Sequence, residues 1–164
     1  MSERPQSPCI KVCVLDSGNR CTGCLRTLDE IAAWPSMSAQ AQWALLGVLE
    51  DRRKIVSDEV VNRIKTHIGT SPAVLFMKGT PDFPQCGFSA QTVAALRASG
   101  AGFHSVNIFE DPELRDALKK FSNWPTYPQL YVNGELVGGC DIVLDMHRSG
   151  ELKKLLTEAG AAGN

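Results

Sequence analysis

Apolar and polar positions alternate in blocks along residues 57–164, and each block predicts one element of regular structure. Short apolar runs bounded by glycine, proline or asparagine predict four strands, at residues 73–77, 103–109, 129–132 and 135–137. One stretch of helical composition begins at residue 57, and three others span residues 88–98, 112–123 and 141–158. The Asn133-Gly134 dipeptide between the last two strands is typical of a type I′ hairpin turn, and Gly150 is a predicted break in the last helix.

The order of these elements defines a fold class. A helical connection between the first two strands favours a parallel pair, and a hairpin adds antiparallel strands. The sequence therefore predicts an α/β domain over residues 57–164 with a thioredoxin-like fold, in which helices flank both faces of a mixed four-stranded sheet.

The first part of the chain, residues 1–55, predicts a separate, mostly helical module. Thr27 and Glu30 stand three residues apart, as in a capping box, and Pro35 ends the short helix that they begin. A second helix is expected to end at the basic residues 52–54, and a further helix would then begin at Ser57.

The apolar stripe of the second helix is predicted at Trp43, Leu46 and Leu49, which lie at helical spacing. Two short helices bury little apolar surface. A module of this size usually needs a metal ion or another covalent or ionic constraint to fold.

Composition narrows the functional classes. The chain has 164 residues and a formal net charge of −1, which gives no electrostatic basis for binding nucleic acid or an anionic membrane. No stretch approaches the roughly 20 apolar residues that span a bilayer. The polar start of the chain carries no charged-then-apolar export signal, so the expected compartment is the cytoplasm.

Six cysteines are distributed unevenly along the chain. Two stand alone, and the other four crowd into the first 24 residues, at Cys9, Cys13, Cys21 and Cys24. A reducing compartment disfavours structural disulfides, so such thiols are more often metal ligands or redox groups. The distribution predicts two different thiol sites.

Cys86 lies between a proline-rich loop and the predicted start of a helix. Free N–H groups at a helix N-terminus favour a thiolate, and Lys78 at the end of the preceding strand adds positive charge. Dithiol exchange would use a second cysteine three residues on, where this chain has Ser89. Cys86 is therefore expected to be a nucleophilic or metal-ligating thiolate without a resolving partner; a buried, inert cysteine is the alternative.

Four motifs resemble the monothiol, CGFS-type glutaredoxins, at residues 78–81, 86–89, 124–129 and 138–141. The likeness covers essentially all of residues 57–164. It implies a cis Tyr127–Pro128 peptide facing the thiol and a glutathione site made by Lys78, Arg115, the Tyr127 backbone and the Cys140–Asp141 turn. Lys78 and Arg115 suit the carboxylates of the tripeptide, and Asp141 suits its amino group. From the sequence alone, a solvated surface charge explains Arg115 equally well.

The same resemblance implies that Cys86 is the one protein ligand of a [2Fe–2S] cluster. Such a cluster commonly takes four thiolates, which two protomers and two glutathione molecules would supply. The implied partners are a second copy in a cluster-bridged homodimer, a BolA-type protein and apo Fe–S client proteins. Cys140 is a further candidate thiol, although its place in the glutathione-binding turn favours use of its backbone or simple burial.

A glutathione-dependent thiol oxidoreductase is the alternative function. It would act through a mixed disulfide between Cys86 and glutathione. The resemblance associates the inserted loop at residues 80–85 with cluster transfer and weak reductase activity. It therefore favours a carrier over an enzyme.

The four N-terminal cysteines have the spacing of a metal knuckle, with three, seven and two residues between successive thiols. Zinc in a tetrahedral site or an Fe–S cluster would satisfy this ligand set and stabilise the module. Dynamic disulfides are the alternative. Residues 8–50 also resemble a short bacterial domain family of unknown function that is sometimes labelled an Fe–S protein, and this resemblance implies no activity.

Overall fold

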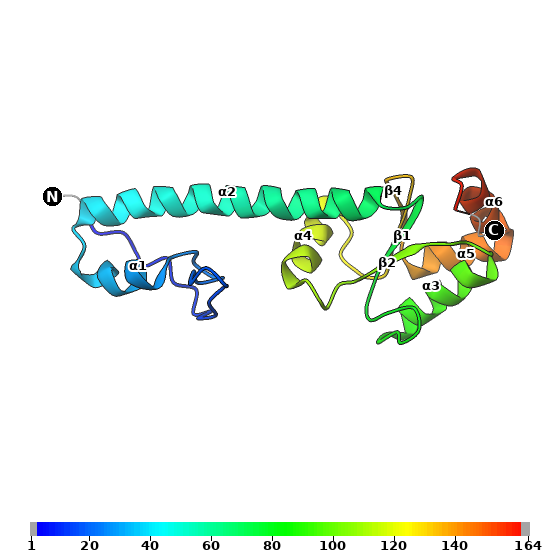
Figure 1. Ribbon diagram of the computed structural model, residues 1–164, viewed down its shortest axis with the longest axis horizontal. Coiled ribbons are helices and arrows are strands. Elements are labelled where there is room, and N and C mark those ends of the chain that lie inside the picture. The colour runs from blue at the N-terminus through cyan, green and yellow to red at the C-terminus, as the bar shows by residue number, and fades with distance from the viewer. Residues whose placement is uncertain (1–2, 162–164) are drawn as a thin grey trace. The chain divides into compact units, whose positions relative to one another are not determined.

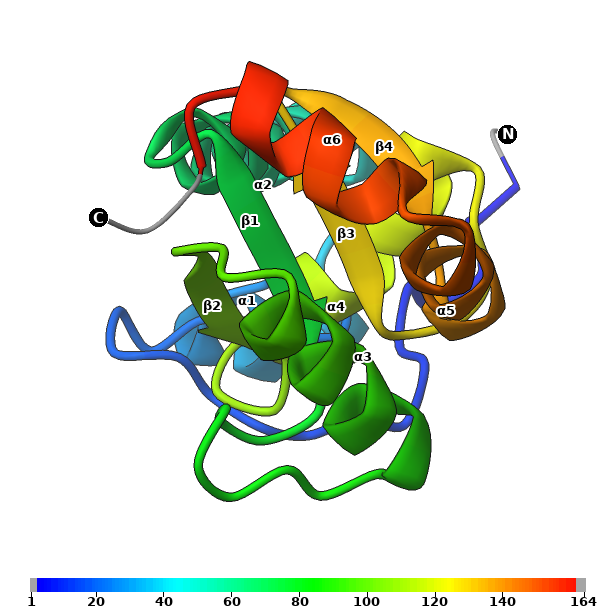
Figure 2. The ribbon, with the colours of Figure 1, turned by 90° about the vertical axis from the view of Figure 1, so that its right-hand side faces the viewer.

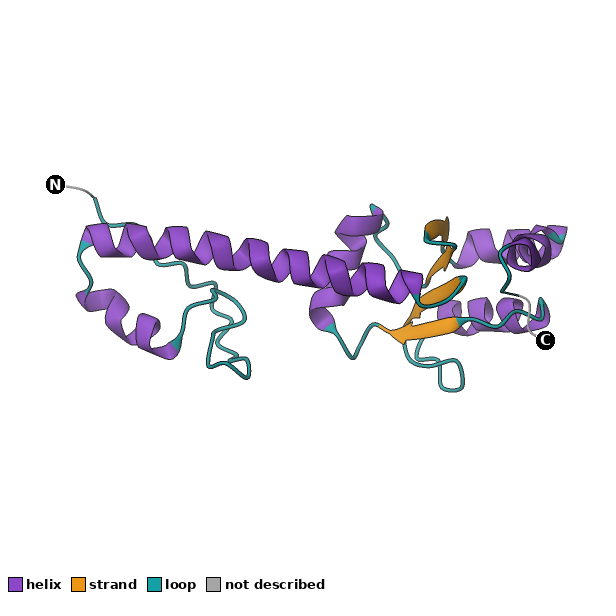
Figure 3. Ribbon diagram, turned by 45° about the horizontal axis from the view of Figure 1, so that its top comes forward, coloured by secondary structure: helices purple, strands orange, loops and turns teal. Residues whose placement is uncertain are grey.

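The computed structural model describes residues 3–161 and divides into two compact units, Met1–Asp58 and Glu59–Asn164. We call the first unit the head and the second the sheet unit. Most of the head before its first helix is loop and turn, whereas helices and strands make up most of the sheet unit (Figures 1 and 3).

The head begins its regular structure with α1, Leu28–Ala33, followed by the 3-10 turn η1, Trp34–Ser36. The predicted capping box is present: the Glu30 N–H donates to Thr27 Oγ1 at 3.2 Å, and the Thr27 N–H donates to the Glu30 carboxylate at 2.8 Å. Pro35 lies in η1, directly after α1, in agreement with the predicted stop.

The next helix, α2, runs without interruption over Ala39–Gly69. The predicted helix end at residues 52–54 and the new start at Ser57 are therefore wrong. No glycine or proline lies between residues 48 and 68 to end the helix, and serine inside a helix costs only a fraction of a kcal/mol, about 0.5. Buried side chains also recur every four residues at Val60, Ile64 and Ile68, which continues the helical period.

The apolar core of the head is small. It consists of Trp34, Leu45 and Leu49, with a few half-buried neighbours. Trp43, predicted in the apolar stripe, is 52% exposed, and its indole N–H donates to the Glu3 carbonyl at 3.0 Å. Leu49 is buried as predicted and Leu46 is half-buried against this core, so only the Trp43 position is wrong. Gln42 is buried beside it instead, and its side-chain amide donates to the Trp34 carbonyl at 2.8 Å.

The sheet unit contains the predicted mixed sheet, with the strand order β2-β1-β3-β4. The strands are β1, Ala73–Met77; β2, His104–Asn107; β3, Gln129–Val132; and β4, Glu135–Gly138. Strands β1 and β2 are parallel, whereas β3 is antiparallel to both β1 and β4. Asn133 and Gly134 both have positive φ, 49° and 84°, as a type I′ turn requires.

Helices cover both faces of this sheet (Figure 2). They are α3, Gly87–Ala98; α4, Pro112–Ser122; α5, Cys140–Ser149; α6, Glu151–Glu158; and the last turns of α2, where His67 packs edge-on against Phe76 of β1. Alternate residues of β1 point to opposite faces, so Leu75 packs with α3, α5 and α6, and Phe76 stacks edge-on with Tyr131 on the other face. All five β1 side chains are fully buried. The predicted thioredoxin-like fold class is confirmed.

Chain ends commonly fray, which predicts a frayed tail over residues 159–164. Ala161 is instead buried, and its carbonyl accepts a 2.7 Å hydrogen bond from the Gly102 N–H. Residues 162–164, the rest of that expectation, lie outside the described residues. Across residues 3–161, none of the helices combines the length and apolar character needed to cross a membrane.

Candidate functional site

Cys86 is the residue that caps the start of α3. Its backbone is extended, with φ −151° and ψ 136°, and the helix begins at Gly87. The loop before it is closed by backbone hydrogen bonds, among them Gln85 N–H to the Lys78 carbonyl at 2.9 Å. Gly79 permits this closure, because a Cβ there would lie 2.5 Å from the Phe83 carbonyl oxygen. The loop thus presents a half-buried thiol at a helix N-terminus.

The pKa of Cys86 is lowered from its ordinary value. The backbone N–H of Ser89 contributes most, and the Phe88 N–H, the charge of Lys78 and the Ser89 hydroxyl act in the same direction. Partial burial opposes them. The site therefore favours a thiolate at Cys86, mainly through main-chain hydrogen bonds.

Ser89 occupies the position where a second cysteine would lie in a dithiol motif. It is fully buried, and its hydroxyl accepts a 3.2 Å hydrogen bond from the Lys78 N–H. Ser89 thereby joins the end of β1 to the first turn of α3. Cys86 has no thiol at this position with which to form an intramolecular disulfide.

A pocket with a volume of about 520 Å³ opens beside this helix start. The five residues predicted to bind glutathione all line it: Lys78, Arg115, Tyr127, Cys140 and Asp141. They come from the end of β1, from α4, from the loop before β3 and from the start of α5. Cys86 itself is not part of the lining, and Lys78 is shared between the pocket and the thiolate environment.

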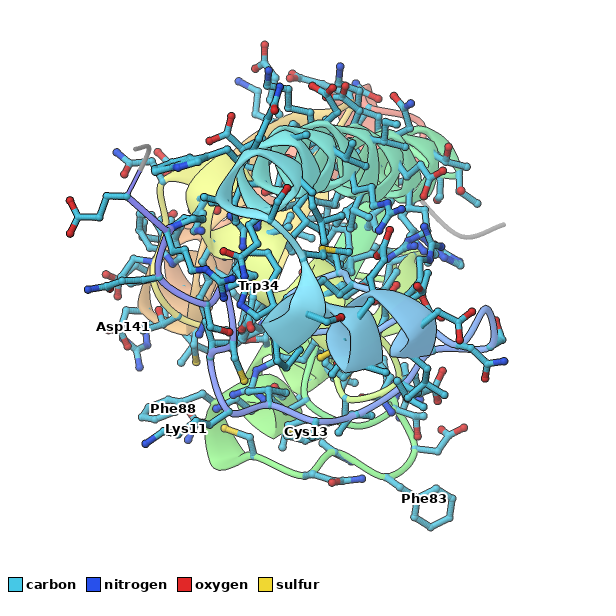
Figure 4. The ribbon with its side chains drawn as sticks, turned by 90° about the vertical axis from the view of Figure 1, so that its left-hand side faces the viewer. Lys11, Cys13, Trp34, Phe83, Phe88 and Asp141 are labelled. Atoms are coloured by element: carbon cyan, nitrogen blue, oxygen red, sulfur yellow. The ribbon has the colours of Figure 1, made fainter. Side chains whose placement is uncertain are left out.

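The loop between α4 and β3 carries the expected cis peptide between Tyr127 and Pro128. The Tyr127 hydroxyl donates to the Arg115 carbonyl at 2.6 Å, which ties this loop to α4. Cys140 is buried at the start of α5, and its thiol lies 3.8 Å from the Gln91 amide oxygen on α3. Asp141 is exposed in the first turn of α5 (Figure 4).

The pocket also contains residues that the sequence analysis did not assign. Lys119 lies one turn after Arg115 on α4, and their spacing of four residues could have signalled a shared face. Trp124 and the exposed Phe88 and Ile142 complete much of the apolar lining. Three cations, Lys78, Arg115 and Lys119, and one carboxylate, Asp141, therefore face one cavity.

The loop before Cys86 carries an exposed aromatic side chain and an ion pair to α3. Phe83, at the tip of the loop before Cys86, is 79% exposed and points away from the protein (Figure 4). Asp82 on this loop forms a 2.7 Å ion pair with Arg97 on α3. The loop is thus joined to the helix that carries the thiol.

The head cysteines fall into two pairs. Cys21 and Cys24 are buried, whereas Cys9 and Cys13 are exposed. Within residues 3–161, no group of three or more Cys, His, Asp or Glu side chains is close enough to hold a metal ion. The predicted four-thiolate ligand set is therefore not assembled in this conformation, and only the pair Cys21 and Cys24 lies together.

Cys24 has a charged neighbour. Burial alone would raise its pKa, but hydrogen bonds from the Arg26 side chain, the Arg26 backbone and the Cys21 thiol outweigh this effect and lower it. Arg26 Nε lies 3.4 Å from Cys24 Sγ. The Cys21 thiol donates to the Val12 carbonyl at 2.9 Å.

Two family models match the chain. The family described as Glutaredoxin matches residues 73–137, and the family described as Protein of unknown function (DUF1289) matches residues 7–53. The two matches do not overlap.

Curated relatives show the same likeness. Monothiol glutaredoxin-5, mitochondrial, of Saccharomyces cerevisiae is 54% identical over 112 residues, which cover 66% of this chain and 75% of that protein. Glutaredoxin 4 of Escherichia coli K12 is 52% identical over 101 residues, 62% of this chain and 88% of that protein. Monothiol glutaredoxin-S11 of rice is 50% identical over 111 residues, 68% of this chain, but the chain spans only 23% of that longer protein.

Solved structures share the fold of the sheet unit. The solution structure of reduced poplar apo GrxS14 is 48% identical, with a TM-score of 0.56, and the match covers 62% of this chain and 93% of that one. The crystal structure of a buckwheat glutaredoxin–glutathione complex is 24% identical, with a TM-score of 0.59, and covers 66% of this chain and 96% of that one. At that identity, the second structure supports the fold alone.

Proposed function

The chain belongs to the glutaredoxin family, and from this premise we propose that the sheet unit binds glutathione and carries a [2Fe–2S] cluster to apoproteins. One observation supports this most strongly. A single thiol that favours the thiolate form lies at the start of α3, beside a pocket with three cations and one carboxylate.

The charges of the pocket match those of glutathione, which has two carboxylates, one ammonium group and one thiol. Lys78 and Arg115 are suited to the carboxylates, and Lys119 adds a third cation on the same side. Asp141 is suited to the ammonium group. A tripeptide held by these residues and by the Tyr127 backbone would bring its thiol toward the Cys86 end of the pocket.

The supply of ligands favours a shared cluster. A [2Fe–2S] cluster commonly needs four thiolates, and the sheet unit offers the half-buried Cys86 as its candidate, because Cys140 is buried. Two copies of Cys86 and two glutathione thiols complete the set. A cluster that takes half of its ligands from glutathione is suited to transfer to another protein.

This arrangement determines the partners that we propose. A second copy of the chain would share the cluster in a homodimer, and a BolA-type protein would replace that copy in a heterodimer. Apo Fe–S proteins would receive the cluster. A reducing cytoplasm suits this role, because Cys86 has to stay a free thiolate between transfers.

The lowered pKa of Cys86 also favours a second candidate, a glutathione-dependent oxidoreductase. The Cys86 thiolate would attack the glutathione sulfur of a protein–glutathione disulfide, and the protein thiolate would leave. A second glutathione thiolate would then attack the Cys86–glutathione bond, releasing glutathione disulfide and regenerating Cys86. Electrons balance, because one protein–glutathione disulfide is broken for each glutathione disulfide formed, and one glutathione thiol is consumed for each protein thiol released.

Anaerobic reconstitution of the full chain with iron, sulfide and glutathione tests the carrier. We expect visible absorption, a dimeric mass and about two glutathione molecules per cluster. Omitting glutathione is the matched control, and it should prevent formation of this species. Cys86→Ser should lose the absorption, the dimer and the bound glutathione together, and retention of all three by this variant would refute the proposal.

A turnover assay decides between the two candidates. With a glutathionylated protein as substrate, the carrier model expects slow release of glutathione, whereas fast turnover that depends on Cys86 would favour the oxidoreductase. Cluster transfer to an apo ferredoxin, followed by circular dichroism, gives the complementary rate. Fast transfer with slow turnover is the outcome that the carrier model expects.

A further inference from the structure

Arg26 in the head is a charged residue in an unusual place. Its side chain is only 3% exposed, and within residues 3–161 no carboxylate lies at ion-pair distance from it. Arginine stays protonated inside proteins, and a buried charge normally requires a partner of opposite charge. The side-chain acceptor that it does contact is the sulfur of Cys24.

The surroundings of Arg26 are built to hold it. Its guanidinium lies over the Trp34 ring, 5.2 Å from the ring centroid, and its carbonyl accepts a 2.8 Å hydrogen bond from the Cys21 N–H. Cys21 and Cys24 are 4% and 1% exposed. A fixed cation and two adjacent thiols therefore share the small core of the head.

The exposed pair of cysteines lies on a segment that runs beside this core. The Thr22 N–H donates to the Val14 carbonyl at 2.8 Å, and the Cys21 thiol donates to the Val12 carbonyl at 2.9 Å. A Cβ on Gly23 would lie 3.0 Å from the side chains of Ile10 and Val12. The segment between Cys9 and Cys13 is thus in direct contact with the turn between Cys21 and Cys24.

The Cys9 sulfur contacts the backbone of its own turn. Its sulfur accepts a hydrogen bond from the Lys11 N–H at 3.5 Å, and Lys11 has a positive φ of 62°. The Cys24 sulfur likewise accepts from a residue two positions later, Arg26. One exposed thiol and one buried thiol are therefore presented in tight turns on neighbouring segments.

We propose that the head binds one zinc ion in two steps, in which Cys21 and Cys24 bind first and Cys9 and Cys13 close over the ion, while Arg26 offsets part of the negative charge of the complex. Only a rearrangement of the exposed segment that carries Cys9 and Cys13 is needed, because the buried pair already lies together. This inference concerns the head and is independent of the function proposed for the sheet unit.

The charge of the product explains the place of Arg26. A zinc ion with four thiolates carries two net negative charges, which are costly to bury without a cation nearby. Arg26 supplies a permanent positive charge and a hydrogen bond to one ligand sulfur. Partners of this kind orient the ligands of a metal and strengthen its binding, and their loss typically lowers metal affinity about 10- to 100-fold.

The test uses the full chain in a Cys86→Ser, Cys140→Ala background, so that all remaining thiols belong to the head. The reduced, metal-free protein is titrated with zinc in competition with a chromophoric chelator under anaerobic conditions. We expect about one zinc per chain and protection of all four head cysteines from iodoacetamide, measured by mass spectrometry. No zinc binding, or protection of Cys21 and Cys24 alone, would overturn the four-ligand site.

Arg26 is tested by substitution. Arg26→Met should lower zinc affinity about 10- to 100-fold with the stoichiometry retained. The zinc affinity of Arg26→Lys should lie between that of Arg26→Met and that of the chain with Arg26. Arg53→Met is the matched control, because Arg53 is an exposed arginine of α2 in the same unit. Equal affinities for Arg26→Met and Arg53→Met would overturn the role of Arg26.

A further variant keeps the proposal testable if Arg26→Met does not fold. Cys9→Ser combined with Cys13→Ser changes only exposed side chains, so the metal-free fold should persist in circular dichroism. Its zinc affinity should fall at least as far as that of Arg26→Met. Undiminished affinity, or formation of an iron–sulfur chromophore in place of zinc binding when both metals are offered with sulfide, would contradict the proposed site.

Discussion

Each of the two units of this chain lowers the pKa of a thiol, but they do so by different means. In the sheet unit, the environment of Cys86 is made mainly by the backbone, because the Ser89 N–H contributes most to its lowered pKa. In the head, a side chain, Arg26, contacts the sulfur of Cys24.

The size of the apolar core explains this difference. The sheet unit fixes its backbone with a fully buried β1 and three helices packed against one face of the sheet. Main-chain N–H groups can then be aimed at a sulfur without further support. The head has a core of three buried apolar side chains. It relies on specific polar contacts, among them the paired hydrogen bonds of 2.7 and 2.9 Å from Arg52 to Glu30.

Truncation of a buried side chain in each core should have the largest effect on the free energy of unfolding. Leu75→Ala removes a fully buried side chain from the extensive core of the sheet unit and should lower the free energy of unfolding by about 4–5 kcal/mol. Leu49→Ala in the head is a matched change of equal burial, but its small cluster can relax around the cavity, so about 2–3 kcal/mol is expected.

Hydrogen exchange followed by mass spectrometry in urea separates the two units in this experiment. Each substitution should accelerate exchange mainly in peptides of its own unit. Leu28→Ala, which truncates an exposed leucine of α1, is the control for both. Equal losses from Leu75→Ala and Leu49→Ala would show that the two cores resist truncation alike.

A substitution in the loop before Cys86 tests whether the backbone of that loop positions the thiol. Gly79 has φ +90°, and an added Cβ would lie 2.5 Å from the Phe83 carbonyl oxygen, so Gly79→Ala combines strain with a backbone clash. We expect a loss of about 2–4 kcal/mol in the free energy of unfolding and slower alkylation of Cys86.

Gly100→Ala is the matched control for this change. Gly100 also has a positive φ, +71°, but a Cβ there would meet no atom within 4 Å. Its substitution should cost only the strain, about 1 kcal/mol, and leave the reactivity of Cys86 unchanged. A similar loss of Cys86 reactivity in both variants would mean that the loop does not position the thiol through its backbone.

A smaller effect is expected for the polar support of the head. Hydrogen bonds from Arg52 hold the pKa of Glu30 below its ordinary value, with a further contribution from the Thr27 N–H. A carboxylate with a depressed pKa in the folded state stabilises the protein above its unfolded pKa, about 4.3, and this stabilisation is lost as the pH falls through the folded value.

Glu30→Gln should therefore lower the free energy of unfolding by about 1–2 kcal/mol at pH 7, and the difference from the unmodified chain should shrink below about pH 4. Urea titrations at several pH values measure it. Asp51→Asn, which removes an exposed ion pair with Lys54 of 3.9 Å, is the control and should change little. If the difference in free energy of unfolding between Glu30→Gln and the unmodified chain did not depend on pH, the substitution would act through the geometry of the side chain rather than through its charge.

Some features could be predicted from sequence because they depend on local chemistry. The apolar run Ala73–Met77, the Asn133-Gly134 turn and the thiol before α3 each follow from residue types at fixed spacing. The fold class follows from their order. The pocket residues predicted from the family resemblance also meet in one cavity, although their contact with glutathione stays a prediction.

Other features depend on tertiary packing, which local spacing does not contain. The sequence at residues 52–57 carries both a C-terminal and an N-terminal helix signal, yet α2 continues through it. Arg52 was assigned to a helix end, but it reaches 22 residues back to Glu30. The same limit applies to His67 and His104, whose rings stack with their centroids 6.0 Å apart although they are distant in sequence.

The smallest predicted effect is on the pKa of Cys86, and it tests directly whether the backbone makes the thiolate in the sheet unit. If the backbone makes the Cys86 thiolate, then Ser89→Ala, which removes the hydroxyl but keeps the N–H, should raise the pKa of Cys86 only slightly. Lys78→Met, which removes a charge, should raise it further, because that charge contributes more than the hydroxyl does.

The alkylation rate of Cys86 as a function of pH measures both effects. Because the pKa is lowered, the midpoint in the unmodified chain should lie below that of an ordinary cysteine, about 8.5, and the variants should move it upward in the order given. If the alkylation midpoint of Ser89→Ala equalled that of an ordinary cysteine, the hydroxyl rather than the backbone would make the Cys86 thiolate. The sheet unit would then hold its thiolate through a side chain, as we infer for the head, and core size would no longer explain how the two units differ.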